Sequence, residues 1–245
     1  FVSGTTQTAT KHLQSLPKKL VKVFDLNKRS FAVDIGSNDG TLLKGYLPYG
    51  VKFLGVDPAG DPVRIANEQG LRTLHAFFDE ETAAYIKENH GQANAITACG
   101  VFAHIANLTG VMKGVKALLA KGGVFATDSQ YWLDMALKLH YDNMFHQHLR
   151  YYSLKPLIHL FRQYDMDVFD VERSDVYGGS IRVYSCHAGD YPIGDALAAT
   201  RNLLPRRAAG MLRFPGVVRG LAPRRAPPID RPVRAEPDPS SEPIP

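Results

Sequence analysis

The chain has 245 residues, of which 44% are apolar, and it carries a formal net charge of +5. This length and apolar content suffice for one α/β domain with a buried core. No run of about 18 apolar residues occurs, so the sequence predicts no membrane-spanning helix and no membrane partner.

The charge is unevenly distributed along the chain. Residues 201–245 hold nine arginines against four acidic residues, together with ten of the sixteen prolines, whereas residues 1–200 carry 20 basic and 20 acidic groups. The sequence therefore predicts a folded domain over 1–200 and a Pro/Arg-rich, disordered tail over 201–245. Because the tail lacks lysine and interleaved aromatic residues, we favour a polar tail over an RNA-binding arm and expect no nucleic-acid partner.

The two cysteines, Cys99 and Cys186, are far apart and form no zinc pattern. A disulfide or metal scaffold is therefore not expected, and no secretory signal is evident. These features favour a cytoplasmic protein.

The first predicted strand, 31–35, leads into the most informative segment, Phe31-Ala-Val-Asp-Ile-Gly-Ser-Asn-Asp-Gly40. An apolar run, a glycine turn and a helical start at Thr41 would bring a ligand onto exposed backbone amides. Asp57 follows Gly36 by twenty-one residues, at the end of the next predicted strand, 52–56. A carboxylate at this position suits a ribose diol, because it can accept hydrogen bonds from both hydroxyls.

The spacing of this turn argues against a dinucleotide. A pyrophosphate loop needs G-x-G-x-x-G, whereas here Gly36, Asn38 and Gly40 are flanked by Asp34 and Asp39. Two carboxylates repel phosphate and suit a cofactor with a cationic amino-acid end and a ribose, which describes S-adenosylmethionine. The alternative is that Asp39 caps the following helix and Asp34 merely closes a strand.

Further strand and helix patterns alternate along the chain. After strands 31–35 and 52–56 we predict strands at 71–75, 95–98 and 124–127. A helix is predicted over 108–120, and the glycines of Lys121-Gly-Gly123 are expected to end it. The last two strands, 166–172 and 180–186, are predicted to form an antiparallel pair. The prediction is a Rossmann-like, doubly wound, mostly parallel α/β sheet with a terminal antiparallel hairpin. This is the plan of a class I methyltransferase.

Two loops at the carboxyl ends of these strands carry candidate ligand contacts. Phe78, with Asp79 beside it, could hold an adenine by stacking, or it could pack onto the next helix. Val101 and His104 follow the fourth strand; His104 could orient a substrate or be a satisfied core histidine.

The loop after the fifth strand is His146-Gln-His-Leu-Arg-Tyr-Tyr-Ser-Leu154. Here the sequence resembles the S-adenosylmethionine-dependent sugar C-methyltransferases, which act on nucleotide-linked keto-deoxysugars. The other segments that carry the resemblance are Val2-Ser-Gly-Thr5, Asp34-Ile-Gly-Ser-Asn-Asp-Gly-Thr-Leu-Leu43, Gly55-Val-Asp-Pro58, Val101-Phe-Ala-His-Ile105 and Gly178-Gly-Ser-Ile-Arg-Val183.

The resemblance implies a C-methyltransferase in which His148 removes the proton next to a ketone, a task that suits a histidine with a near-neutral pKa. It implies that His104 positions the substrate or stabilises the oxyanion. The predicted cofactor contacts are Asp34, Gly36, Ser37, Asn38, Gly40, Asp57, Phe78 and Val101; the predicted substrate contacts are His146, Arg150, Tyr177, Gly178 and Gly179.

The chain departs from the family pattern at the predicted catalytic loop. Phe145 and Gln147 replace the usual tyrosine and glutamate, and Tyr177 stands where histidine is common. Family members also carry a zinc module and a carboxyl-terminal α/β domain, neither of which we expect in this chain. Two alternatives therefore stay open: a small-molecule O- or N-methyltransferase, and a truncated, non-catalytic cofactor-binding remnant.

A metal site at His146 and His148, completed by Asp142, is a further alternative that we do not favour, because no glutamate or cysteine partner is nearby. The sequence does not predict the oligomeric state.

Overall fold

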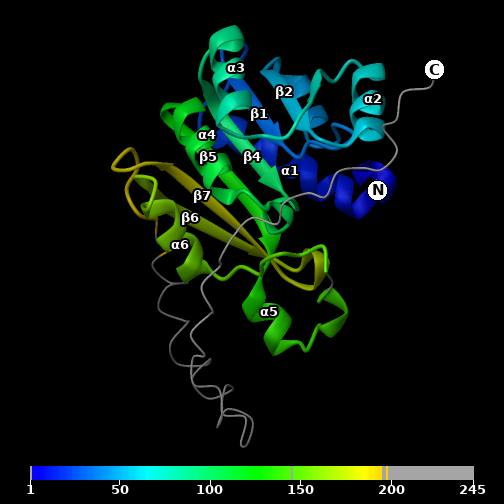
Figure 1. The fold of residues 1–245 in the computed structure, drawn as a ribbon, viewed down its shortest axis with the longest axis vertical. Helices are drawn as coiled ribbons and strands as arrows, with labels where there is room; N and C mark the ends of the chain where they lie inside the picture. The colour runs from blue at the N-terminus through cyan, green and yellow to red at the C-terminus, as the bar shows by residue number, and fades with distance from the viewer. Residues whose placement is uncertain (1, 145, 195–196, 198–245) are drawn as a thin grey trace, which may run out of the picture. The chain divides into compact units, whose positions relative to one another are not determined.

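The computed structural model describes residues 2–144, 146–194 and 197. These residues form a seven-stranded sheet in the order β3-β2-β1-β4-β5-β7-β6 (Figure 1). Its strands are β1 (Phe31–Ile35), β2 (Lys52–Asp57), β3 (Thr73–His75), β4 (Ala93–Cys99), β5 (Leu119–Gln130), β6 (Met166–Ser174) and β7 (Ser180–His187).

Strands β1 to β5 pair in parallel, and β7 pairs antiparallel with both β5 and β6. The predicted parallel sheet with a terminal antiparallel hairpin is therefore confirmed. The strand order reverses between β1 and β4, and a parallel sheet leaves a crevice at the carboxyl ends of its strands at such a point.

Helices cover both faces of the sheet. They are α1 (Gln7–Val23), α2 (Gly60–Glu68), α3 (Glu80–His90), α4 (Leu108–Leu118), α5 (Trp132–Leu137) and α6 (Leu154–Arg162), with short 3-10 helices η1 (Ser3–Thr5), η2 (Leu43–Tyr49), η3 (Phe102–His104), η4 (Tyr141–Asn143) and η5 (Val176–Gly178). None of the described helices is long and apolar enough to cross a membrane.

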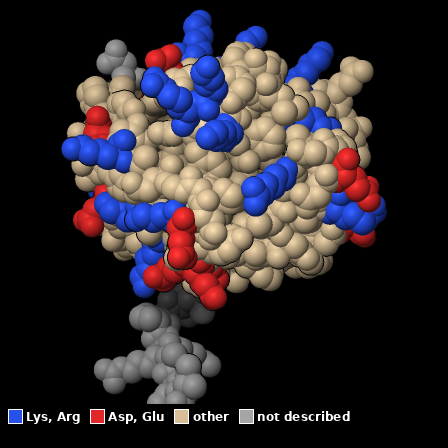
Figure 2. Space-filling view, turned by 90° about the horizontal axis from the view of Figure 1, so that it is seen from above, with Lys and Arg blue, Asp and Glu red and all other residues tan. Residues whose placement is uncertain are grey.

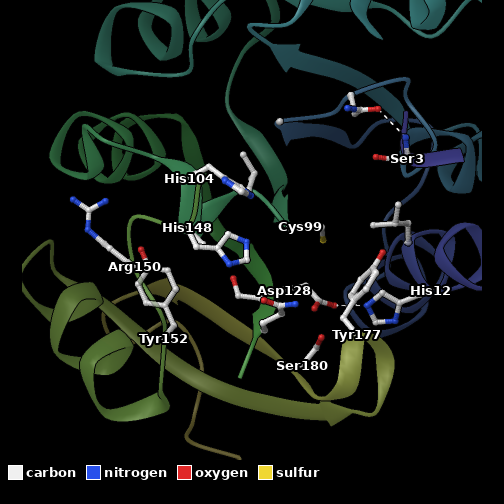
Figure 3. A pocket seen from close by; sticks show the side chains of 18 of the residues that line it. Ser3, His12, Cys99, His104, Asp128, His148, Arg150, Tyr152, Tyr177 and Ser180 are labelled. Atoms are coloured by element: carbon white, nitrogen blue, oxygen red, sulfur yellow. Dashed lines mark hydrogen bonds and ion pairs between the residues drawn. The ribbon is translucent and has the colours of Figure 1, made fainter. Parts of the chain in front are cut away.

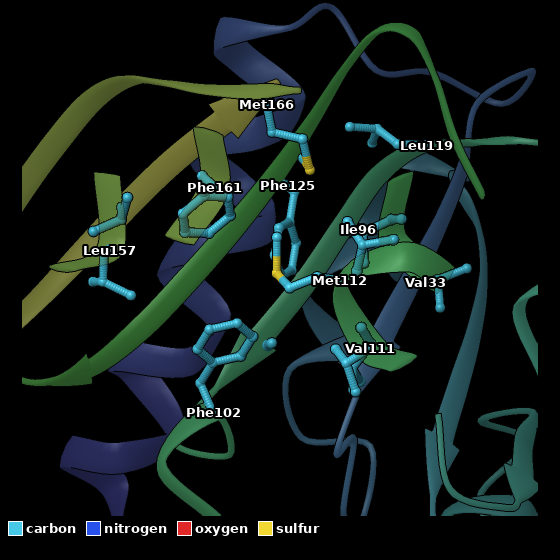
Figure 4. Close-up of a cluster of buried hydrophobic side chains, with 14 of the residues drawn as sticks. Val33, Ile96, Phe102, Val111, Met112, Leu119, Phe125, Leu157, Phe161 and Met166 are labelled. Carbon is cyan, nitrogen blue, oxygen red and sulfur yellow. The ribbon is translucent and has the colours of Figure 1, made fainter. Parts of the chain in front are cut away.

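The core lies in two layers because successive residues of β1 point to opposite faces. Val33 packs with the cluster beneath α3, α4 and α6, part of which is drawn in Figure 4. Ala32 packs on the other side with Leu16 and Leu20 of α1. All five residues of β1 are buried, as expected for a central parallel strand covered on both faces.

On the face in Figure 2, several Lys and Arg side chains lie close together and others project singly, while Asp and Glu lie mostly in small groups. Several charges pair locally. Arg64 lies 2.8 Å from Glu68 along α2, and Lys113 of α4 lies 3.3 Å from Glu80 of α3. Exposed pairs of this kind contribute little to stability.

Some predicted boundaries are wrong. The helix expected to begin at Thr41 is instead the 3-10 helix η2, in whose first turn the N–H of Gly45 donates to Leu42, three residues earlier. The predicted glycine C-cap is also wrong: α4 ends at Leu118, and the glycines bulge β5 instead. Gly123 is required there, because a Cβ would come within 2.8 Å of the Ala120 carbonyl oxygen.

The strand predicted over 71–75 begins at Thr73, because the N–H of Leu71 donates to Ala66 at the end of α2. The tail predicted over 201–245 lies outside the described residues, so its disorder stays a prediction.

Candidate active site

A cleft of about 480 Å³ opens at the carboxyl ends of β1, β2, β4 and β5 (Figure 3). Of the residues predicted from the sequence, it is lined by Gly36, Asn38, Asp57, Val101, His104, His148, Arg150 and Tyr177. The structure thus brings together residues from the glycine turn, the second strand and both histidine segments.

The glycine turn after β1 is shaped by its contact with Val101, in the segment that follows β4. Gly36 has a φ of +68°, and a Cβ there would lie 2.5 Å from a methyl of Val101. Only glycine fits this approach. Asn38, at φ 51°, also adopts the left-handed conformation, and its side-chain oxygen accepts a hydrogen bond from the N–H of Ser3. The turn is therefore fixed by both the sheet and the segment before α1.

Asp57 ends β2 and is only 6% exposed. Its two oxygens accept one backbone hydrogen bond each, from Asn38 at 2.9 Å and from Ala59 at 2.8 Å. The carboxylate thus joins the glycine turn to the start of α2. Each oxygen has a second lone pair with which it can accept a hydrogen bond from a ligand.

Asp34 and Asp39, predicted to face a cationic cofactor end, do not line the cleft. Asp34 is buried and accepts a hydrogen bond from the hydroxyl of Thr97 at 2.5 Å. Burial and, to a smaller extent, the charge of Asp57 raise the pKa of Asp34 to about 7, although the Thr97 bond opposes this shift. Asp39 accepts the N–H groups of Gly4 and Thr41. Asp34 thus bonds within the sheet, and Asp39 organises the backbone behind the cleft.

Three other predicted cofactor contacts also lie behind the cleft wall. Ser37 is buried, and Gly40 packs so closely that a Cβ would come 2.6 Å from a methyl of Leu71. Phe78 is buried in the core beside Gly114, and Asp79 caps α3 through the N–H of Thr82. The structure therefore favours the packing alternative for Phe78.

The two histidines of the cleft lie together. The ring centroids of His104 and His148 are 4.7 Å apart, at an interplanar angle of 56°. Nδ1 of His104 lies 2.9 Å from the carbonyl oxygen of Gln147. A carbonyl oxygen only accepts, so this nitrogen carries the proton. The N–H of Leu149 donates to Ala103, which holds the histidine loop along η3.

The pKa of His148 is lowered, mainly by burial and further by the positive charge that His104 can carry, while a backbone contact with Asn143 opposes the shift. His148 is therefore neutral at pH 7, and a neutral imidazole can accept a proton.

The rest of the predicted loop takes other positions. His146 and Gln147 are exposed and do not line the cleft, and Phe145 lies outside the described residues. Arg150 lines the cleft, but its guanidinium donates to the backbone carbonyls of Ile105 and Ala106. Among the described residues, no group of three or more His, Cys, Asp or Glu side chains could hold a metal ion.

Tyr177 lines the cleft from the turn between β6 and β7, whereas Gly178 and Gly179 support that turn from behind. A Cβ on Gly178 would lie 2.4 Å from the ring of His140, and one on Gly179 would lie 2.5 Å from Asp134. The two glycines thus allow the turn to pack closely against the segment after β5.

A charged cluster on the Tyr177 side of the cleft is not predicted from the sequence. Nε2 of His12 lies 2.8 Å from Asp128, and Nε of the buried Arg182 donates to the same carboxylate oxygen at 3.0 Å. One sequence signal was available: Asp128 interrupts an apolar strand, and a buried carboxylate requires partners.

Comparisons with known proteins identify the family of this chain. The methyltransferase domain family matches residues 9–171. The chain belongs to this family. It is also 33% identical over 199 residues to the C-methyltransferase NovU of Streptomyces niveus. The matched region covers 81% of this chain and 47% of that relative. The chain thus spans about half the length of that curated relative.

Solved structures show the same fold at low identity. A S-adenosylmethionine-dependent methyltransferase from Clostridium acetobutylicum is 15% identical, with a TM-score of 0.56 over 74% of this chain and 92% of that one. Magnesium protoporphyrin IX methyltransferase from Synechocystis, with bound SAH, is 11% identical, with a TM-score of 0.57 over 73% and 83%. These likenesses concern the fold, and they agree with the class I methyltransferase plan predicted from the sequence.

Proposed function

We propose that this chain transfers a methyl group from S-adenosylmethionine to the carbon next to the ketone of a nucleotide-linked keto-deoxysugar. The observation that carries the proposal is the pair of His104 and His148 on the cleft, with the pKa of His148 lowered. Methylation at carbon requires removal of a proton, for which a neutral imidazole is suited. The relative named as a C-methyltransferase supports the carbon acceptor, and the sequence resemblance supports the sugar.

The cleft fits the cofactor at two points. The missing Cβ of Gly36 lets the turn lie close to Val101, so that the backbone of the turn borders the cleft. The buried carboxylate of Asp57 keeps acceptor capacity for ribose hydroxyls beyond its two backbone bonds. Gly36 and Asn38 would hold the amino-acid end, Asp57 would hold the ribose, and the bound cofactor supplies an electrophilic methyl group on sulfur.

The protein's own groups then perform the proton transfer. His148 accepts the proton from the carbon next to the ketone, which leaves an enolate as the carbon nucleophile. His104 fixes the loop that carries His148, because its Nδ1–H is bound to Gln147. The remaining contribution is orientation, since nucleophile and methyl group must be held in line.

The proposal is tested by incubating the 245-residue chain with S-adenosylmethionine and a nucleotide-linked 4-keto-6-deoxysugar, followed by NMR of the product. We expect a new carbon-bound methyl group and its loss in His148→Gln, by roughly 10²–10⁴ in rate. His159→Gln, on the outer side of α6, is the matched control and keeps full activity.

Methylation of hydroxyl or amine acceptors only, at a rate that His148→Gln leaves unchanged, would refute the proposal in favour of an O- or N-methyltransferase. A folded chain that binds S-adenosylhomocysteine but methylates no acceptor would instead support the non-catalytic alternative.

A further inference from the structure

Tyr177 has a backbone conformation that is unfavourable for a residue with a large side chain. Its φ and ψ are 55° and 31°, in the left-handed region. Few residues other than glycine, asparagine and aspartate adopt this conformation, and it clusters at functional sites. The phenol ring, 53% exposed, is directed to the cleft.

The surrounding turn holds this conformation in place. The carbonyl oxygen of Gly178 accepts a hydrogen bond from Nζ of Lys138 at 2.7 Å, and that of Gly179 accepts from the N–H of Tyr131 at 3.0 Å. Ser180 closes the turn by donating its hydroxyl to Val176 at 2.9 Å. With these bonds on both sides, the peptide at Tyr177 cannot relax without breaking the turn.

The ring of Tyr177 is also fixed on its far side. The imidazole of His12 meets it edge to face, with centroids 6.4 Å apart. His12 is in turn held by Asp128, whose charge is balanced by the buried Arg182.

The hydroxyl of Tyr177 is a hydrogen-bond donor at neutral pH. Burial, followed by the charge of Asp128, raises the pKa of Tyr177 above its usual value, so the phenol keeps its proton. His104, the other candidate donor, has its Nδ1–H bound to the carbonyl oxygen of Gln147.

We propose that Tyr177 is a further catalytic residue, whose hydroxyl donates a hydrogen bond to the ketone oxygen of the substrate from the wall opposite His148 (Figure 3). This inference rests on the proposed function. When His148 takes the proton, the C–H electron pair becomes the C=C bond and the carbonyl π pair moves to oxygen. The phenol keeps its own proton and stabilises the oxygen anion, as donors of an oxyanion hole do.

The test uses proton exchange, which needs no methyl transfer. The 245-residue chain is saturated with S-adenosylhomocysteine, and NMR follows the exchange of the keto-sugar proton into D₂O. We expect Tyr177→Phe to slow the exchange by about 10²–10³, as loss of one oxyanion donor does. Tyr85→Phe, a tyrosine of α3 with a similar exposure of 49%, is the control and exchanges at the unmodified rate.

A second variant separates chemistry from folding. Tyr177→Asn suits the left-handed backbone but is too short to cross the cleft, so it should fold and bind S-adenosylhomocysteine normally while losing exchange equally. Exchange at the unmodified rate in either variant overturns the role of Tyr177. No exchange and no carbon methylation by the unmodified chain overturns the proposed function itself.

Discussion

Replacement of Asp57 by asparagine tests the cofactor site most directly. The carboxylate accepts the N–H groups of Asn38 at 2.9 Å and Ala59 at 2.8 Å, and in the proposed complex it also accepts the ribose hydroxyls. Asparagine keeps one acceptor oxygen but turns an NH₂ group toward the other donors. One charge-assisted hydrogen bond from a backbone N–H and one from the ribose are therefore lost, each worth about 1.5–3 kcal/mol.

The expected changes follow from these two losses. Cofactor-free Asp57→Asn should lose about 1.5–3 kcal/mol of unfolding free energy, because one buried backbone N–H loses its acceptor. Its dissociation constant for S-adenosylhomocysteine should rise about 10- to 150-fold, since 1.4 kcal/mol corresponds to a factor of ten. Urea unfolding measures the first quantity and calorimetric titration the second.

Asp61→Asn is the matched control, because its side chain in the first turn of α2 is 91% exposed and should affect neither measurement. Two results separate the roles of Asp57. A loss of stability with unchanged affinity would show that the carboxylate only joins the turn to α2, and would refute the ribose contact. Unchanged stability would refute the estimate drawn from the two backbone bonds.

Three further predictions concern pH and backbone strain. In a pH profile of kcat/KM, activity should fall on the acidic side only below pH 6.5, because the lowered pKa keeps His148 unprotonated. In His104→Gln this fall should occur at a higher pH, because the substitution removes a charge that lowers the pKa of His148. Leu139→Gly should raise the unfolding free energy by about 1 kcal/mol in urea, because Leu139 is exposed at a φ of 56°. The pKa of Asp34 is raised from 3.8 to about 7, so its protonated form stabilises the fold fully below pH 3.8, and this contribution is lost as the pH rises through 7. Asp34→Asn should abolish that decline in unfolding experiments at pH 4.5 and 8; a decline equal to that of the unmodified chain would contradict the assignment.

The cofactor side of the cleft was predictable because its signals are local in the chain. The strand predicted over 31–35 matches Phe31–Ile35, since five buried residues in a row with a glycine after them have few other structures. Gly36 and Asp57 belong to consecutive strands that pair in parallel, so their spacing in sequence determines their proximity in space.

The direction of individual side chains was less predictable. An aromatic residue after a strand can face the ligand or the core, and for Phe78 the choice depends on the space left by Gly114, thirty-six positions later. Asp34 likewise turns to Thr97, a neighbour on the adjacent strand β4, rather than to the cleft. Both outcomes depend on packing between elements, which sequence spacing does not give.

The charged cluster of His12, Asp128 and Arg182 was missed because its members are far apart in sequence. His12 and Asp128 are 116 positions apart, and Asp128 and Arg182 are 54 apart. Their contact follows from the insertion of β7 beside β5, so that Asp128 and Arg182 become cross-strand partners. A hairpin prediction alone does not tell which of its two strands pairs with β5.

Residues other than glycine that have a positive φ can owe this conformation to local structure or to a functional site. Five described residues other than glycine have a positive φ: Asp25, Asn38, Leu139, Asp165 and Tyr177. Asparagine and aspartate tolerate this conformation, so only Leu139 and Tyr177 require a further explanation. Leu139 lies two residues beyond the end of α5, where the N–H of His140 donates to Met135 in a common helix-terminating motif, and its side chain is exposed. Tyr177 lies in the tight turn η5, where the N–H of Gly178 donates to Asp175 and that of Gly179 donates to Val176, but its ring lines the cleft opposite His148. Strain persists only where the surrounding structure enforces it, and at Tyr177 that structure borders the candidate site.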